Sequence, residues 1–224
     1  MTAPADFARC KACHGWDGLG SMGSYANRTG VSSGAASRPD VDSTNVRTAA
    51  LSLTHQQLFD LIARPDGRPM NSSDSRHPEY ASFLTEGQVW NLVKFIREEW
   101  INPNDLYDLS VTGAAMHYEY SVANGWALVS PTMTYTNIGA NGDKVNGQAV
   151  YDAACAVCHG ADGKTSPPGG TQSIGQFTRA KPYEAWFKIK FGEPGKMNPG
   201  LVTDTTDMID LYAALADATL FPNL

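Results

Sequence analysis

The segment "CAVCHG" at Cys155–Gly160 decides how this chain is interpreted, because a near copy, "CKACHG", stands at Cys10–Gly15. Each copy contains Cys-x-x-Cys-His, in which two thiols lie one helical turn apart and an imidazole follows directly. This spacing lets both thiols add to the vinyl groups of one haem while the imidazole reaches the iron. The motif therefore predicts one covalent haem attachment site in each half of the chain.

A single Cys-x-x-Cys pair is also typical of a dithiol oxidoreductase or of half a zinc site. Zinc would require the two motifs to come together, and a dithiol oxidoreductase would be expected among alternating strands and helices, which the sequence does not indicate. The repeat favours haem: each motif continues as Gly-x-Asp-Gly, and a Met follows in a Gly/Pro turn, in "PDGRPMN" (65–71) and "PGKMN" (194–198). All four Cys residues belong to the two motifs.

Each half then closes with an amphipathic helix. Apolar residues recur at i, i+3, i+4 and i+7 in both, namely Val89, Leu92, Val93 and Ile96, and Met208, Leu211, Tyr212 and Leu215. Met208 lies on such a stripe, so it is expected to be a packing residue.

Other helix signals are local. Thr54 with Gln57, and Thr85 with Gln88, fit the capping-box pattern. Pro182 predicts the start of a helix that Gly192 ends.

The segment between the halves has a different character. Residues 117–120 and 126–129 flank Asn124-Gly125, which favours a β-hairpin with a two-residue type I′ turn. We expect domains at 1–103 and 145–224, joined by a connector at 104–144.

The composition narrows the function. The 224 residues carry a net charge of −6, which argues against a nucleic-acid partner, because phosphate binding needs clustered Lys and Arg. No stretch approaches the roughly 20 apolar residues of a membrane-spanning helix, so no membrane anchor is expected in this chain. The opening "MTAPADFARC" lacks the basic start and apolar run of a secretory signal peptide.

The chain resembles the class I cytochromes c, as two consecutive single-haem domains. The segment "GQAVYDAACAVCHGADG" from Gly147 is very close to the opening pattern of that family, "GKMNP" fits its distal loop, and the helix holding Leu211 and Tyr212 fits its closing helix. The resemblance implies a mainly α fold of two helical domains around two covalent haem c groups. It also implies that Gly147 and Tyr151 lie where the first helix of the second domain crosses the last helix of that domain.

The resemblance further implies the haem-binding residues. His159 and Met197 would be the axial ligands of the second haem, with Cys155 and Cys158 as its thioethers. The matching set in the first domain is Cys10, Cys13, His14 and Met70.

The first domain departs from the family pattern. It lacks the Gly eight residues before Cys10, and 56 residues separate His14 from Met70, against 38 from His159 to Met197. His77 and His117 are therefore rival ligands to Met70, whereas His55 is expected on the surface.

Ligation by imidazole and thioether leaves no open position on the iron, which indicates an electron carrier and not a catalyst. The family's haem attachment outside the cytoplasmic membrane implies a periplasmic protein. The net charge favours redox partners with basic docking patches. One alternative is a two-haem oxidoreductase, peroxidase-like or acting on sulfur compounds, with an open or exchangeable site at the first haem. The others are a haem-bearing subunit of a larger complex and an interaction module built on the hairpin.

Overall fold

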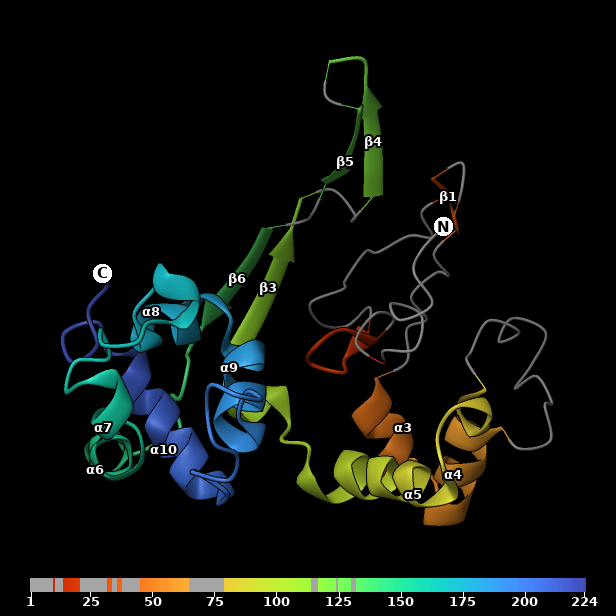
Figure 1. Ribbon diagram of the computed structural model, residues 1–224, viewed down its shortest axis with the longest axis horizontal. Helices are drawn as coiled ribbons and strands as arrows, with labels where there is room; N and C mark the ends of the chain where they lie inside the picture. The colour runs from red at the N-terminus through yellow and green to blue at the C-terminus, as the bar shows by residue number, and fades with distance from the viewer. Residues whose placement is uncertain are drawn as a thin grey trace. The chain divides into compact units, whose positions relative to one another are not determined.

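The computed structural model describes residues 10, 14–20, 45–64, 79–113, 117–123, 125–129 and 132–224, together with short paired strands β1 (Ser32–Ser33) and β2 (Ala36–Ser37) (Figure 1). The chain divides into a first unit, Met1–Trp100 with Val111–Met133, and a second unit, Ile101–Ser110 with Thr134–Leu224. The mainly helical fold expected from the sequence is confirmed, whereas the expected domain bounds stay a prediction. Within the described ranges, no helix is both long and apolar enough to cross a membrane.

Among the α-helices described in the first unit, the second and third begin at the capping boxes that the sequence predicts. The described helices are α3 (Val46–Ser52), α4 (His55–Ala63) and α5 (Glu86–Lys94), and α5 continues as a π-helical turn, η3 (Phe95–Glu99). The Thr54 hydroxyl accepts from the Gln57 backbone N–H at 3.2 Å, and the Gln57 side chain accepts from the Thr54 N–H at 2.9 Å. Thr85 and Gln88 form the same reciprocal pair, so both capping boxes are confirmed.

The core of the first unit lies between α4 and α5. Leu58 and Ile62 of α4 are buried, as are Val89 and Val93 of α5. The rings of Phe59 and Trp90 stack at 4.5 Å between centroids. The short 3-10 turn η2 (Tyr80–Ser82) precedes α5 in the first unit, and η4 (Pro103–Asp105), which follows η3 along the chain, belongs to the second unit.

The expected hairpin is present in the connector. Strand β4 (His117–Ser121) pairs antiparallel with β5 (Gly125–Val129), and β3 (Asp108–Thr112) pairs with β6 (Thr132–Thr136). The last paired residues of the hairpin are Ser121 and Gly125, so the two-residue turn expected at Asn124-Gly125 is wrong. Three residues, 122–124, separate the paired positions, and Gly125 has a φ of 67°; hairpins with a connection of this length commonly use one left-handed glycine.

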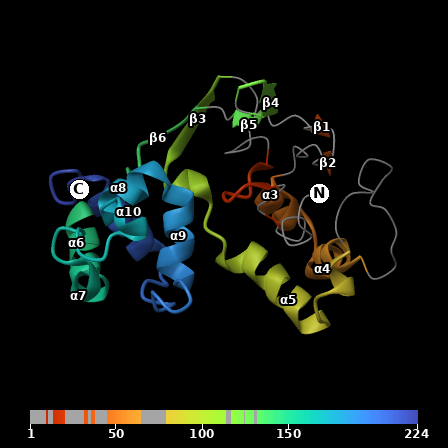
Figure 2. The same ribbon diagram turned by 45° about the horizontal axis from the view of Figure 1, so that its top comes forward.

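The second unit is built from α6 (Lys144–Ala154), α7 (Ala156–His159), η5 (Pro168–Gly170), α8 (Ile174–Ala180), α9 (Pro182–Phe191) and α10 (Thr205–Ala216). The side chains of Asp143, Ser173 and Asp204 accept backbone N–H groups at the starts of α6, α8 and α10. Pro182 begins α9 and Gly192 ends it with a φ of 69°, as predicted. In two views, α10 lies between α6 and α9 (Figures 1 and 2).

The helices α6 and α10 cross in direct backbone contact. A Cβ at Gly147 would lie 1.8 Å from the carbonyl oxygen of Asp210, so only glycine fits this crossing. The Asp210 carboxylate accepts from the backbone N–H of Asp143 at 2.6 Å and from the side chain of Asn146 at 2.8 Å. Tyr151 is fully buried one turn further along α6, where its ring meets Phe221 edge-on at 4.5 Å. Gly147 therefore lies at this crossing, as the resemblance implies, and Tyr151 packs against the segment that follows α10.

Replacing Gly147 with alanine is expected to lower the free energy of unfolding of the second unit by about 3 kcal/mol, because the added methyl meets backbone that cannot move aside. Thermal unfolding of the holoprotein would measure the loss. Gly87→Ala is the matched control, because a Cβ at this helical glycine of α5 meets nothing within 4 Å. Helix propensity should make the control neutral or slightly stabilising, and equal destabilisation by both changes would contradict the close crossing.

The end of α10 is tied to the start of α6 by Asp217. Its carboxylate accepts from the Lys144 ammonium at 2.8 Å and from the Thr219 hydroxyl at 2.6 Å. These hydrogen bonds, with the Lys144 bond the largest cause, hold the pKa of Asp217 well below its usual range.

A carboxyl whose pKa is depressed in the folded state stabilises that state above the unfolded pKa of about 3.9, and loses this contribution as pH falls further. Asp217→Asn is therefore expected to lower the melting temperature near pH 7, with the difference from the natural protein shrinking below about pH 4. Melting curves across this pH range would measure it. Asp152→Asn, at an exposed carboxylate of α6, is the control, and a pH-independent difference for Asp217→Asn would contradict the assignment.

Candidate functional site

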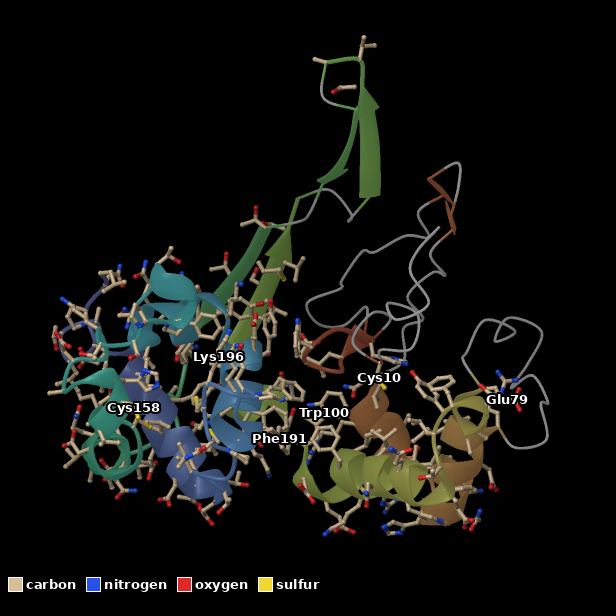
Figure 3. All side chains as sticks on the ribbon, in the orientation of Figure 1. Cys10, Glu79, Trp100, Cys158, Phe191 and Lys196 are labelled. Carbon is tan, nitrogen blue, oxygen red and sulfur yellow. The ribbon has the colours of Figure 1, made fainter. Side chains whose placement is uncertain are left out.

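The second Cys-x-x-Cys-His motif occupies the junction of α6 and α7. Cys155 ends α6, and its carbonyl accepts from the backbone N–H groups of Cys158 at 3.1 Å and His159 at 3.0 Å. This single turn carries both thiols and the imidazole. Cys155 is buried and Cys158 is exposed, and both are free thiols (Figure 3 labels Cys158).

The Cys155 thiol lies in surroundings that disfavour its charged form. Burial, together with the neighbouring Cys158, raises the pKa of Cys155 to about 11. An activated dithiol nucleophile has a lowered pKa, so the environment of Cys155 is not that of a reactive thiolate.

The imidazole of His159 is half-buried. Its Nδ1 atom is buried and has no hydrogen-bond partner within the described ranges. A buried polar atom left unpaired costs about 1–3 kcal/mol, which suits a ring whose position is set by a bound group. The backbone around the ring is fixed, because the His159 carbonyl accepts from Thr165 at 2.9 Å and the Tyr151 hydroxyl donates to the Gly160 carbonyl at 2.7 Å.

Met197 lies on the loop that follows α9. Its backbone N–H and carbonyl form two bonds of 2.9 Å with Glu193, and the Gly200 N–H donates to the Lys190 carbonyl at 2.9 Å. A Cβ at Gly192 would lie 2.4 Å from the Met197 carbonyl oxygen, so this glycine lets the loop fold onto the end of α9. The backbone of Met197 is thereby fixed, with its side chain half-buried.

Glu193 supports the same loop from the surface. Its carboxylate pairs with the ammonium groups of Lys188 at 2.7 Å and Lys196 at 2.9 Å, and these bonds lower its pKa to about 2. Sequence reasoning missed Glu193 and the close approach of Gly192. The i, i+3 spacing of Glu193 and Lys196 could have indicated their ion pair. No local sequence pattern indicates that Gly192 lies against the Met197 carbonyl.

The predicted site residues of the second half therefore fall on two elements of one unit. Cys155, Cys158 and His159 share one turn, and Met197 lies on a separate loop. The free thiols, the unpartnered imidazole nitrogen and a fixed methionine fit a covalently bound haem, while the role of Met197 as distal ligand stays a prediction. Met208 is 2% exposed on α10, which confirms it as a packing residue.

The first motif is described in part. Cys10 and His14 are half-buried, and the Cys10 sulfur lies 3.7 Å from the Tyr80 hydroxyl. Cys13, Met70 and the rival ligand His77 lie outside the described residues, as does the side chain of His117. The ligands of the first haem therefore stay a prediction. His55 lies on the surface, 3.6 Å from the carboxylate of Glu98.

The family model described as cytochrome c matches residues 5–100 and 145–213. The chain belongs to the cytochrome c family. Each matched segment of this cytochrome c contains one Cys-x-x-Cys-His motif and one candidate methionine, and the stretch left unmatched includes the hairpin. No curated protein and no solved structure matched the chain. Family membership supports covalently bound haem c and a role in haem-based electron transfer.

Proposed function

We propose that this cytochrome c is a periplasmic electron carrier with two covalently attached haems, one in each unit, each held between a histidine and a methionine. The observation that carries the proposal is the position of the two motifs, because each of the two family-matched segments contains its own Cys-x-x-Cys-His. The chain offers no other cysteines for attachment.

The residues of the second unit account for how such a carrier works. When bound, a haem iron supplies a reversible one-electron change of valence. His159 and Met197 would occupy both axial positions, which leaves no position for a substrate, and the soft thioether favours the ferrous state. Because the backbone of Met197 is fixed by Glu193 and Gly192, little geometry has to change between the two valence states.

The location and the partners follow from the same proposal. Attachment of this kind of haem outside the cytoplasmic membrane, as in the family, supports the periplasm. Encounters between redox proteins are brief and bury little area, and the net charge of −6 supports partners with basic docking patches.

A second candidate function rests on the first unit. The longer separation of His14 from Met70, 56 residues against 38, supports an exchangeable axial position there, as a peroxidase-like or sulfur-compound-oxidising enzyme needs. The relatives that oxidise thiosulfate use a cysteine thiolate as ligand, and this sequence has no cysteine to spare.

A spectroelectrochemical titration of the purified protein tests both functions. The carrier predicts two haems per chain and a sulfur-to-ferric charge-transfer band at the red edge with the intensity of two methionine-ligated irons. Half of that intensity, with carbon monoxide binding at one iron, would favour the enzyme. A colourless protein would refute both.

A further inference from the structure

Residues 217–224 follow α10 and fold back against the second unit. We call them the closing segment. The N–H of Phe221 donates to the Asp217 carbonyl at 2.9 Å, and the end of the chain lies beside α8 in two views (Figures 1 and 2). The Phe221 side chain is 0% exposed, although Leu220 before it and Asn223 after it are exposed. One ring of an otherwise exposed segment is therefore fully enclosed by the unit.

Two glycines and a tyrosine form the slot that encloses this ring. A Cβ at Gly175 of α8 would lie 2.4 Å from the Cβ of Phe221, and one at Gly163 would lie 3.2 Å from its Cδ1. The third wall is the ring of Tyr151, which meets Phe221 edge-on at 4.5 Å between centroids. The Ile174 N–H donates to the Gly163 carbonyl at 3.0 Å, which joins the loop after the second motif to α8.

The backbone of the closing segment is held by Arg179 of α8. Its guanidinium donates to the carbonyls of Leu215 at 2.8 Å and Phe221 at 3.0 Å, and to the side-chain oxygen of Asn223 at 2.7 Å. A planar guanidinium has its donors in a fixed arrangement, so these bonds set the end of α10 and the closing segment relative to each other. Phe221 is thereby fixed through both its side chain and its carbonyl.

The ring of Tyr151 transmits this position to the second motif. Its hydroxyl donates to the Gly160 carbonyl at 2.7 Å, and Gly160 directly follows His159. Burial is the main cause that raises the pKa of Tyr151 well above its usual value, so the hydroxyl keeps its proton and remains a donor. The hydroxyl reaches this acceptor only while packing holds the ring in place, and Phe221 supplies part of that packing.

We propose that Phe221 is a positioning residue for His159, the axial ligand of the second haem. It holds the Tyr151 ring, and the Tyr151 hydroxyl holds the backbone directly after His159. The inference rests on the proposed haem of the second unit. The backbone of Met197 is held by other contacts, those with Glu193, so the two axial ligands are positioned separately. Loss of the Phe221 ring loosens the histidine side alone.

Amide hydrogen exchange of the holoprotein, followed by NMR, tests this separation in Phe221→Leu. The Thr165 N–H donates to the His159 carbonyl, and the Gly200 N–H donates to the Lys190 carbonyl in the Met197 loop. The Thr165 amide should exchange roughly tenfold faster than in the natural protein, because the turn opens locally, whereas the Gly200 amide should keep its rate. No acceleration at Thr165, or equal acceleration at both amides, would overturn the proposal.

A double-mutant cycle tests the route through the tyrosine hydroxyl. Tyr151→Phe removes the hydroxyl and keeps the ring. The readout is the set of haem methyl resonances of the ferric protein, which respond to the orientation of the axial imidazole. The Cys155→Ala, Cys158→Ala double variant, which should lack the second haem, identifies which resonances belong to that haem.

The variants Phe221→Leu and Tyr151→Phe should each shift the resonances of the second haem and leave those of the first haem in place. The double variant should shift them no further than the larger single change, because both changes remove the same bond. A stabilising role alone would lower the melting temperature without moving these resonances. Additive shifts, or none, would contradict the proposed route.

Phe177→Leu is the matched control, because it makes the same change at a phenylalanine of α8 that is 8% exposed. The Phe177 ring lies near the ammonium groups of Lys181 and Lys188, at 5.8 and 5.9 Å from its centroid. This control should lower the melting temperature but leave the Thr165 exchange rate and the methyl resonances unchanged. Changes as large as those of Phe221→Leu would overturn the proposal.

Thermal unfolding checks that each variant folds, and Phe221→Met serves if Phe221→Leu does not, because methionine fills irregular space without supplying a ring. The pyridine haemochrome assay of the natural protein separates the two levels of the argument. A second haem with unchanged Thr165 exchange and methyl resonances in the variants would refute the positioning role alone. Absence of the second haem from the natural protein would refute the proposed function first.

Discussion

Replacement of both Cys155 and Cys158 by alanine is expected to halve the covalent haem of the purified protein, from two per chain to one. All four cysteines belong to the two motifs, so no other thiol can take over the attachment in the second unit. The pyridine haemochrome absorbance per mole of chain would measure the ratio. The second unit should also unfold at lower temperature, because Cys155 is buried where a porphyrin would complete the core.

Val157→Ala is the control for this double change. Val157 lies between the two cysteines and is 88% exposed, so its truncation leaves thiols and packing unchanged. It should retain both haems. Cys10→Ala with Cys13→Ala should give the converse result, with the remaining haem in the second unit. A natural protein with one haem per chain, or a Cys155/Cys158 variant that keeps two, would refute the two-haem proposal.

Local signals in the sequence predicted the helices well. The capping boxes at Thr54 and Thr85 form as expected, because a cap needs only side chains and backbone within three residues of one another. The start of α9 at Pro182 and its end at Gly192 are equally local. The stripe that contains Met208 is buried because one side of α10 faces the core.

Features that depend on distant backbone were not predictable in this way. The register of β4 with β5 depends on which residues pair, and Asn-Gly is compatible with more than one connection. The contact of Gly192 with the Met197 loop arises only when the loop folds back on α9.

Replacement of Met197 by leucine is expected to change both the absorption spectrum of the protein and the reduction potential of the second haem. Leucine keeps the size of the side chain but cannot ligate iron, so the sulfur-to-ferric band should fall to half and carbon monoxide should bind at one iron. The potential of that iron should fall by on the order of 100 mV or more, within the range of roughly 0.8 V that axial ligands set. Spectroelectrochemistry of the holoprotein would measure both.

Met208→Leu is the matched control, since it makes the same chemical change at a methionine that is buried on α10. Exchange of core side chains of similar volume lowers the free energy of unfolding by less than about 1.5 kcal/mol. Met208→Leu should therefore leave the sulfur-to-ferric band and both reduction potentials unchanged. If Met197→Leu also leaves them unchanged, Met197 is not a ligand. If only Met197→Leu alters them, Met197 is the ligand, and the close approach of Gly192 to the Met197 carbonyl is what holds the ligand loop against the end of α9.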